Sequence, residues 1–173
     1  MSDSRPIILT ASMEVGAQSF FDERRERYFP ADRNWLDAHI TLFHALPGEC
    51  HLHVSDILAR QTASTTVIAA SVTGIRNLGG GVAYVIRSDS LSAFRGILEQ
   101  EFASWLTPQD RQKFNPHVTV QNKVTRTEAR QTEAILAAEF SRFELAITGV
   151  GAWRYDGGPW AREADYAFHR SAT

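Results

Sequence analysis

Two patterns of apolar residues alternate along the chain. Short segments in which apolar and polar residues alternate, or in which β-branched residues run together, predict strands, and segments with apolar residues at three- and four-residue steps predict helices. The predicted strands are 6–13, 38–46, 67–77, 82–88, 116–122, 142–154 and 160–170. The predicted helices are 15–28, 55–63, 89–106 and 125–140.

Turn and cap signals separate these segments. Gly79-Gly80-Gly81 lies between two predicted strands and indicates a hairpin. A phosphate-binding loop is the weaker interpretation, because no helix start with Lys-Ser or Lys-Thr follows these glycines. Thr125-Arg-Thr-Glu128 is a capping-box pattern. No linker divides the chain, so we expect residues 1–173 to form one α+β domain with helices packed on mostly antiparallel sheets.

Composition narrows the functions that are expected. Hydrophobic residues make up 43% of the chain, which is ample for a core, and the net charge is −2. This net charge argues against binding of long duplex nucleic acid but is compatible with a small nucleotide substrate. Cys50 is the single cysteine and we expect it to be a bystander. It fits a reducing compartment, and the apolar run near the N-terminus is too short for a signal peptide or membrane span, so we expect a cytoplasmic protein.

Two His-x-Thr motifs are the strongest chemical signal. His39-Ile-Thr-Leu42 and His117-Val-Thr-Val120 each lie in a predicted strand. Side chains at i and i+2 of a strand share a face, so each His should lie beside its Thr. By the same alternation Phe43 should continue the first face and Gln121 the second, while the aliphatic residues anchor each strand in the core.

Paired histidines suit phosphodiester chemistry. Opening a 2′,3′-cyclic phosphate needs a base that deprotonates water and an acid that protonates the leaving oxygen. Imidazole titrates near neutral pH, so one ring can be neutral while the other is charged. Threonine hydroxyls can donate hydrogen bonds to the non-bridging oxygens. Exchanging the two roles gives ligation, and neither direction requires a metal.

The two motifs resemble those of the two-histidine (2H) phosphoesterase superfamily, which includes 2′-5′ RNA ligase-like proteins and cyclic nucleotide phosphodiesterases. Phe114-Asn115-Pro116 before the second motif is also similar to that family. The resemblance implies two similar β-rich lobes around a pseudo-two-fold central cleft. It also implies that His39 and His117 are catalytic and that Thr41 and Thr119 bind phosphate. One departure is Phe43-His44-Ala45-Leu46, where many members have a glycine-containing turn, and it bears on the shape of one cleft wall.

These observations together predict a metal-independent phosphoesterase without a cofactor. Its expected partner is a nucleotide or short RNA end, and we expect a monomer that binds no membrane and takes part in RNA processing. Phe43 could stack on a base or pack in the core, and Gln121 and Lys123 could touch phosphate or base. Two alternatives stay open: a nucleotide-binding module of the same fold without turnover, and a dedicated 2′-5′ RNA ligase.

Other polar residues have simpler interpretations. We expect His44, His51 and His53 to be solvated loop residues rather than metal ligands, since no acidic or Cys partner has a recognisable spacing. Arg24, Arg25 and Arg27 are expected on the solvent face of the first helix. Trp153-Arg154-Tyr155 could form a base-binding patch, although ordinary strand packing is favoured.

Overall fold

The computed structural model describes residues 3–170, which form four α-helices and seven strands. The strands are β1 (Ile7–Met13), β2 (Ile40–Leu46), β3 (Ile68–Asn77), β4 (Val82–Arg87), β5 (His117–Gln121), β6 (Phe143–Arg154) and β7 (Ala161–Ala167). The helices are α1 (Val15–Tyr28), α2 (His51–Ala63), α3 (Asp89–Glu101) and α4 (Arg126–Glu139), with short 3-10 turns at Ala31–Arg33 and Gly48–Cys50. The predicted α+β class is confirmed.

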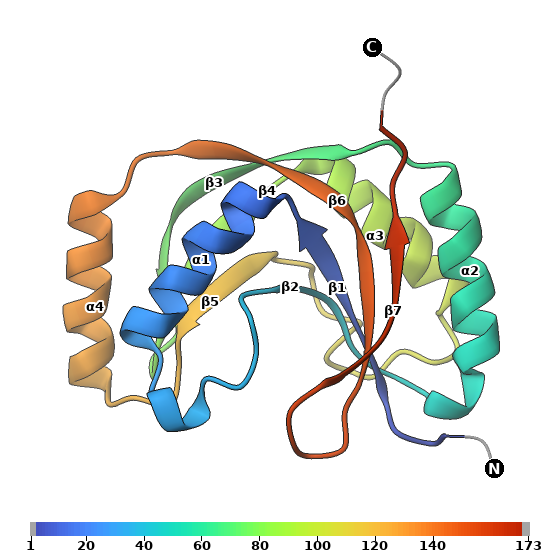
Figure 1. Ribbon diagram of the computed structural model, residues 1–173, viewed down its shortest axis with the longest axis horizontal. Coiled ribbons are helices and arrows are strands. Elements are labelled where there is room, and N and C mark those ends of the chain that lie inside the picture. Colours follow the sequence, from blue (N-terminus) through green and yellow to red (C-terminus); the bar gives the residue numbers. More distant parts are fainter. Residues whose placement is uncertain (1–2, 171–173) are drawn as a thin grey trace.

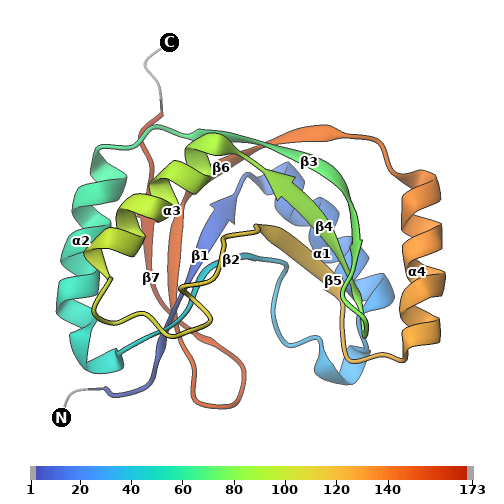
Figure 2. The same cartoon turned by 180° about the vertical axis from the view of Figure 1, so that it is seen from behind.

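All seven strands belong to one antiparallel sheet. The strand order is β2-β1-β6-β3-β4-β5, and β7 pairs with β6. Helices α1 and α4 lie at one end of the molecule, and α2 and α3 lie at the other (Figure 1, Figure 2). The sheet curls strongly between them, so that β2 and β5, which are its two outermost strands in this order, come within 8 Å of each other between Cα atoms.

The order of elements repeats along the chain. The series β1-α1-β2-α2-β3 has the same order as β4-α3-β5-α4-β6. The strand order repeats as well. From one edge of the sheet inward the strands are β2, β1 and β6, and from the other edge inward they are the equivalent strands β5, β4 and β3. Each half therefore supplies one of the two outer strands that carry the His-x-Thr motifs.

The predicted turn and cap both form. Leu78 N–H donates to the Gly81 carbonyl at 2.8 Å and closes the β3–β4 hairpin. A side chain at Gly81 would meet the Gln121 carbonyl of β5 at 2.0 Å, so only glycine fits there. The capping box of α4 is complete, with Thr125 and Glu128 each bonded to the other's backbone N–H.

Several element boundaries differ from the sequence prediction. Helix α2 begins at His51 instead of residue 55, so His51 and His53 lie in a helix and not in a loop. Helix α3 ends at Glu101 and not at residue 106, so Phe102 and Trp105 lie after it. Strand β2 begins at Ile40, one residue after His39. No helix within residues 3–170 has the length and apolar character that a membrane crossing needs.

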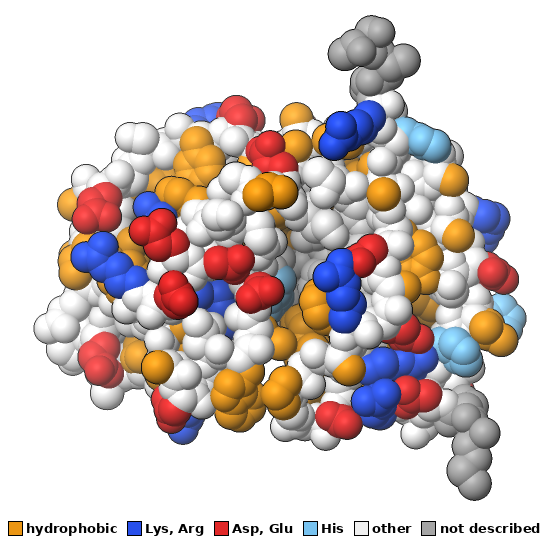
Figure 3. All heavy atoms as spheres, viewed as in Figure 1, with side chains coloured by type: hydrophobic (Ala, Val, Ile, Leu, Met, Phe, Trp, Pro, Cys, Tyr) orange, Lys and Arg blue, Asp and Glu red, His pale blue; other side chains and the backbone are white. Residues whose placement is uncertain are grey.

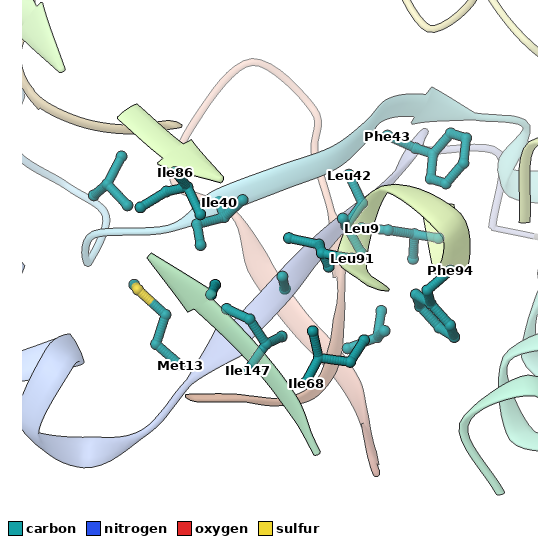
Figure 4. Close-up of a cluster of buried hydrophobic side chains, with 14 of the residues drawn as sticks. Leu9, Met13, Ile40, Leu42, Phe43, Ile68, Ile86, Leu91, Phe94 and Ile147 are labelled. Carbon is teal, nitrogen blue, oxygen red and sulfur yellow. The ribbon is translucent and has the colours of Figure 1, made fainter. Parts of the chain in front are cut away.

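A single apolar core underlies both halves. Its members come from every strand except β7 and from all four helices, and Figure 4 shows one cluster of them, including Leu9 of β1, Leu42 of β2 and Leu91 of α3. The aliphatic residues of both motifs are completely buried in this core, with exposed fractions of 0–1%. The core therefore holds the two motif strands by the side chains that face away from the histidines.

Candidate active site

The two motifs share the same local backbone irregularity. In β2 the register with β1 shifts between Phe43 and Thr41, and in β5 the register with β4 shifts between Gln121 and Thr119. Each shift is a β-bulge that adds one residue directly after the threonine, and a bulge redirects the side chains that follow it. His and Thr in each motif are half-buried, and the next two residues are both buried.

The bulge corrects the expectation for Phe43. Simple alternation placed it on the face of His39 and Thr41, but its ring is 0% exposed and packs edge-on against Phe102 at 5.3 Å between centroids. Figure 4 shows Phe43 among the core side chains, beside Leu42 and near α3. The buried ring has no face available for a base, so the alternative of core packing is the correct one.

Gln121 and Lys123 also lie apart from the histidines. Gln121 is 5% exposed, and its amide donates to Thr132 Oγ1 of α4 at 2.8 Å. That bond ties β5 to the helix behind it. Lys123 is exposed in the turn after β5 and has φ 62°, with its N–H donating to Asn122 Oδ1. Neither residue lines the cavities that His39 and His117 line.

Both catalytic candidates are held by the same hydrogen bond. His39 Nδ1 lies 2.8 Å from the Asp37 carbonyl, and His117 Nδ1 lies 2.9 Å from the Asn115 carbonyl. A carbonyl oxygen only accepts, so Nδ1 carries the proton in each ring. Nε2 is then left as the nitrogen that can exchange a proton with a substrate.

The environment of His39 favours its neutral form. Burial is the main cause that lowers the pKa of His39 to about 4. The bond to the Asp37 carbonyl opposes this shift, while the charges of Arg25, His117 and His44 act in the same direction as burial. His117 and His44, whose charges both act on the His39 ring, line one and the same cavity.

Two cavities open beside the histidines. One, of about 370 Å³, is lined by His39 together with Trp35, Trp153 and Trp160. The other, of about 220 Å³, is lined by Thr41 of the first motif and His117 of the second. The second cavity therefore unites residues from the two halves of the chain. Among residues 3–170, no group of three or more His, Cys, Asp or Glu side chains is placed to hold a metal ion.

Aromatic rings surround His39. The Trp160 ring lies 4.7 Å from the His39 ring between centroids, and Trp153 lies 6.3 Å from Trp160. Trp153 is fixed by its Nε1–H, which donates to Thr10 Oγ1 at 2.9 Å. Trp35 is 61% exposed at the rim. Sequence reasoning singled out Trp153 but gave no role to Trp35 and Trp160, which lie outside the strands and helices of the structure.

Two buried arginines brace the motif strands. Arg25 of α1 is 4% exposed and donates to the Thr119 carbonyl at 2.9 Å, which corrects its expected place on the solvent face. Arg95 of α3 is 3% exposed and donates to the Leu42 carbonyl at 3.3 Å. The sequence contained a signal for the burial of Arg25. Arg25 follows Ala17 and Phe21 at four-residue steps, and these two apolar residues mark the buried face of α1.

These features and the comparisons with known proteins agree. The outer strands of the α+β sheet bring the two His-x-Thr motifs to neighbouring cavities. Residues 14–159 match the family model of the 2′-5′ RNA ligase superfamily, and the chain belongs to that superfamily. The resemblance seen in the sequence is thereby confirmed, and family and fold support a phosphoesterase-type function.

Solved structures share the fold at low sequence identity. E. coli LigT complexed with 3′-AMP has a TM-score of 0.66 at 14% identity and covers 97% of this chain and 100% of that chain. TT0787 of Thermus thermophilus has a TM-score of 0.63 at 12% identity and covers 96% and 100%. A structure described as a phosphoesterase has a TM-score of 0.64 at 13% identity and covers 97% and 100%. Comparison with curated proteins gave no match.

Proposed function

We propose that this protein is a metal-independent phosphoesterase that acts on a 2′,3′-cyclic phosphate or a 2′-5′ phosphodiester, at an RNA end or on a small nucleotide. The observation that carries this proposal is the matched pair of imidazoles, each with Nδ1 bound to the carbonyl two residues earlier. Two rings fixed in this way, on strands that approach each other, suit acid and base roles at one phosphate. Chain 1–173 would act as one domain whose two lobes each supply one histidine.

The proposed reaction needs one proton acceptor and one proton donor. One imidazole takes a proton from the attacking water at Nε2, and the other gives a proton to the leaving ribose oxygen as its bond to phosphorus breaks. The lowered pKa keeps His39 neutral at neutral pH, so His39 suits the role of proton acceptor when it is the ring beside the attacking water. The reverse direction exchanges the roles. Thr41 and Thr119 would donate hydrogen bonds to the non-bridging oxygens.

The first test of this proposal is a substrate screen with nucleoside 2′,3′-cyclic phosphates and 2′-5′-linked dinucleotides, in the presence of EDTA. Turnover of either class supports the proposal and also decides which bond is cleaved. Binding without turnover of any of them would instead support a binding module of the same fold. A cytoplasmic location, a monomeric state and a role in RNA processing stay predictions.

The low pKa of His39 predicts an acid-tolerant enzyme. A proton acceptor must be neutral, and a pKa of about 4 keeps His39 neutral down to mildly acidic pH. We therefore expect the acid limb of kcat/KM to lie near pH 4, well below the ordinary histidine value of 6.5. The measurement is a pH–rate profile from about pH 3.5 to 9 with chemistry rate-limiting, in which the apparent values belong to the histidine pair. An acid limb at or above the ordinary value of 6.5 would contradict this assignment.

The tryptophan-lined cavity suggests where the nucleoside binds. E. coli LigT has been crystallised with 3′-AMP, ATP and NADP⁺, all of which contain adenine. In our protein, Trp160 and Trp153 line a cavity that His39 also lines, and aromatic rings stack well on bases. We propose that this cavity takes the base, while the cavity of Thr41 and His117 takes the phosphate.

Trp160→Ala should weaken nucleotide binding. Loss of one stacking contact costs about 1–3 kcal/mol per base, so we expect the Kd for 3′-AMP to rise roughly 5- to 150-fold. The measurement is calorimetric titration with 3′-AMP, and inorganic phosphate, which has no base, is the matched control. Equal losses for both ligands would mean that Trp160 supports the site as a whole and does not stack on the base.

A further inference from the structure

A third histidine faces the phosphate-side cavity. His44 was expected to be a solvated loop residue, but it lies in β2, and its side chain is 46% exposed where it lines the 220 Å³ cavity with Thr41 and His117. The bulge after Thr41 turns Phe43 into the core and leaves His44 on the outside. Strands rise about 3.3 Å per residue, so His44 reaches the cavity roughly 7–10 Å further along β2 than Thr41.

A buried carboxylate holds His44 in place. Asp110 is 2% exposed and accepts from His44 Nδ1 at 2.8 Å. It also accepts from the backbone N–H groups of His44 and Ala45 at 2.9–3.2 Å. Burial alone would raise the pKa of the Asp110 carboxyl, but these hydrogen bonds outweigh it and the pKa falls below its usual value. Asp110 is thus a fixed negative charge that is already matched by its own donors.

This arrangement fixes the His44 ring for a ligand. An ionised carboxylate only accepts, so Nδ1 of His44 carries a proton, and Nε2 is the ring nitrogen left to donate to an anion when the ring is in its protonated form. The bond is the third in the site that holds an imidazole by Nδ1, after those of His39 and His117. The contact joins β2 to a segment 66 residues further along the chain.

Positive side chains gather at the same cavity. Arg76 of β3 and Lys113 line it and are both exposed. Arg76 also lines an adjoining cavity of about 300 Å³ with Arg87 and His117. Within residues 3–170, neither Arg76 nor Lys113 forms an ion pair with a carboxylate. Arg95, in contrast, is occupied by Glu99 and by the Leu42 and Asp110 carbonyls.

The excess of positive charge is local. On the face that Figure 3 shows, Lys and Arg side chains are interspersed with Asp and Glu, and the whole chain has net charge −2. In the cavity, Asp110 is the one carboxylate among the lining residues, and it is already bound. Unpaired cations in a concave site on an otherwise balanced surface attract an anion.

We infer that His44, Arg76 and Lys113 form a second anion site, which binds another phosphate group of the substrate next to the reacting one. This inference rests on the proposed function, since Thr41 and His117, which line the same cavity, are assigned to the reacting phosphate. Asp110 is a positioning residue in this site. The second phosphate is either the free 5′-phosphate of the same nucleotide or the next phosphodiester of an RNA chain.

The test compares a monophosphate with two larger ligands, of which the bisphosphate adds a phosphate alone and ApAp adds a phosphate with a second adenosine. Calorimetric titrations would use adenosine 3′-monophosphate, adenosine 3′,5′-bisphosphate and the dinucleotide ApAp. We expect the wild-type protein to bind one or both of the larger ligands about tenfold more tightly than the monophosphate, as a charge-assisted hydrogen bond allows. A gain with the bisphosphate alone indicates a small nucleotide substrate, and a gain with ApAp indicates an RNA chain.

Two variants then test whether the gain in affinity comes from the proposed second anion site. His44→Ala and Arg76→Ala should each remove most of the tenfold advantage and change the affinity for the monophosphate less than twofold. His53→Ala on α2 and Arg130→Ala on α4 are the controls, because both residues are exposed and neither lines these cavities. Thermal unfolding of each variant shows whether the fold is intact, and Arg76→Ala leaves the Asp110 contacts untouched.

The outcomes separate this inference from the proposed function. If the monophosphate binds but neither larger ligand has an advantage, or if His44→Ala weakens all ligands alike, the second anion site is wrong and the proposed function stands. If selective binding is present but no substrate is turned over, the site is right and the enzymatic proposal fails. If none of the nucleotides binds, both are overturned.

Discussion

Alanine in place of His39 or His117 should lower the rate of phosphodiester cleavage by about 10²–10⁴-fold, the usual contribution of a positioned acid or base. Affinity for a nucleotide should change far less, because each imidazole acts mainly in the transition state. The measurement is kcat with the best substrate of the screen, together with the Kd for 3′-AMP. The double variant should lose much less than the product of the two single losses, since acid and base serve the same step.

The chain offers a matched control for these variants. His53 is exposed on α2 and lines neither of the cavities beside the histidines. His53→Ala should leave the rate unchanged. If His39→Ala and His117→Ala change only the thermal stability, or weaken binding and rate to the same extent, the two histidines are not the acid and base and the mechanism proposed above is wrong.

The sequence predicted the elements well because their signals are local. Alternation, the glycine hairpin and the capping box at Thr125 depend on neighbours within a few residues, and these elements lie within a few residues of their predicted bounds. The start of α2 was placed four residues late. Its first turn, His51-Leu-His-Val54, has no side-chain cap and little apolar pattern, so the sequence carried no signal for it.

Site residues within one short sequence pattern could be predicted, and site residues brought together from distant parts of the chain could not. The two motifs were evident because each is a short pattern within one strand. The contact between His44 and Asp110 spans 66 residues, and the cavity of His39 joins Trp35 to Trp160. Nothing in the local sequence at Asp110 or Trp160 indicates these neighbours, because the curl of the sheet brings them together.

The β-bulges explain the one systematic error in the site. Strict alternation predicts that the residue four places after each histidine returns to the cleft face, and at Phe43 and Gln121 it does not. A bulge is set by pairing with the neighbouring strand, which a single strand's sequence does not reveal. The prediction fails in the same way at both motifs, because both strands have the bulge directly after the threonine.

Phe43→Ala should therefore act on stability and not on base recognition. The ring is 0% exposed and contacts Phe102 and the guanidinium of Arg95, so its removal leaves a cavity in the core. We expect a loss of about 3–5 kcal/mol in the free energy of unfolding, which is a large share of the stability of an ordinary domain. Denaturant unfolding of the variant and the wild type measures it.

Ligand binding distinguishes this role from stacking. Phe43→Leu retains most of the apolar volume, so it should stay folded and bind 3′-AMP and inorganic phosphate as the wild type does. Trp160→Ala should give the opposite result, with nearly unchanged stability and weakened 3′-AMP binding, because its ring lies half-exposed beside His39. If Phe43→Leu weakens 3′-AMP binding while phosphate binding and stability are preserved, Phe43 contacts the base after all, and the strand must rearrange at its bulge when a nucleotide binds.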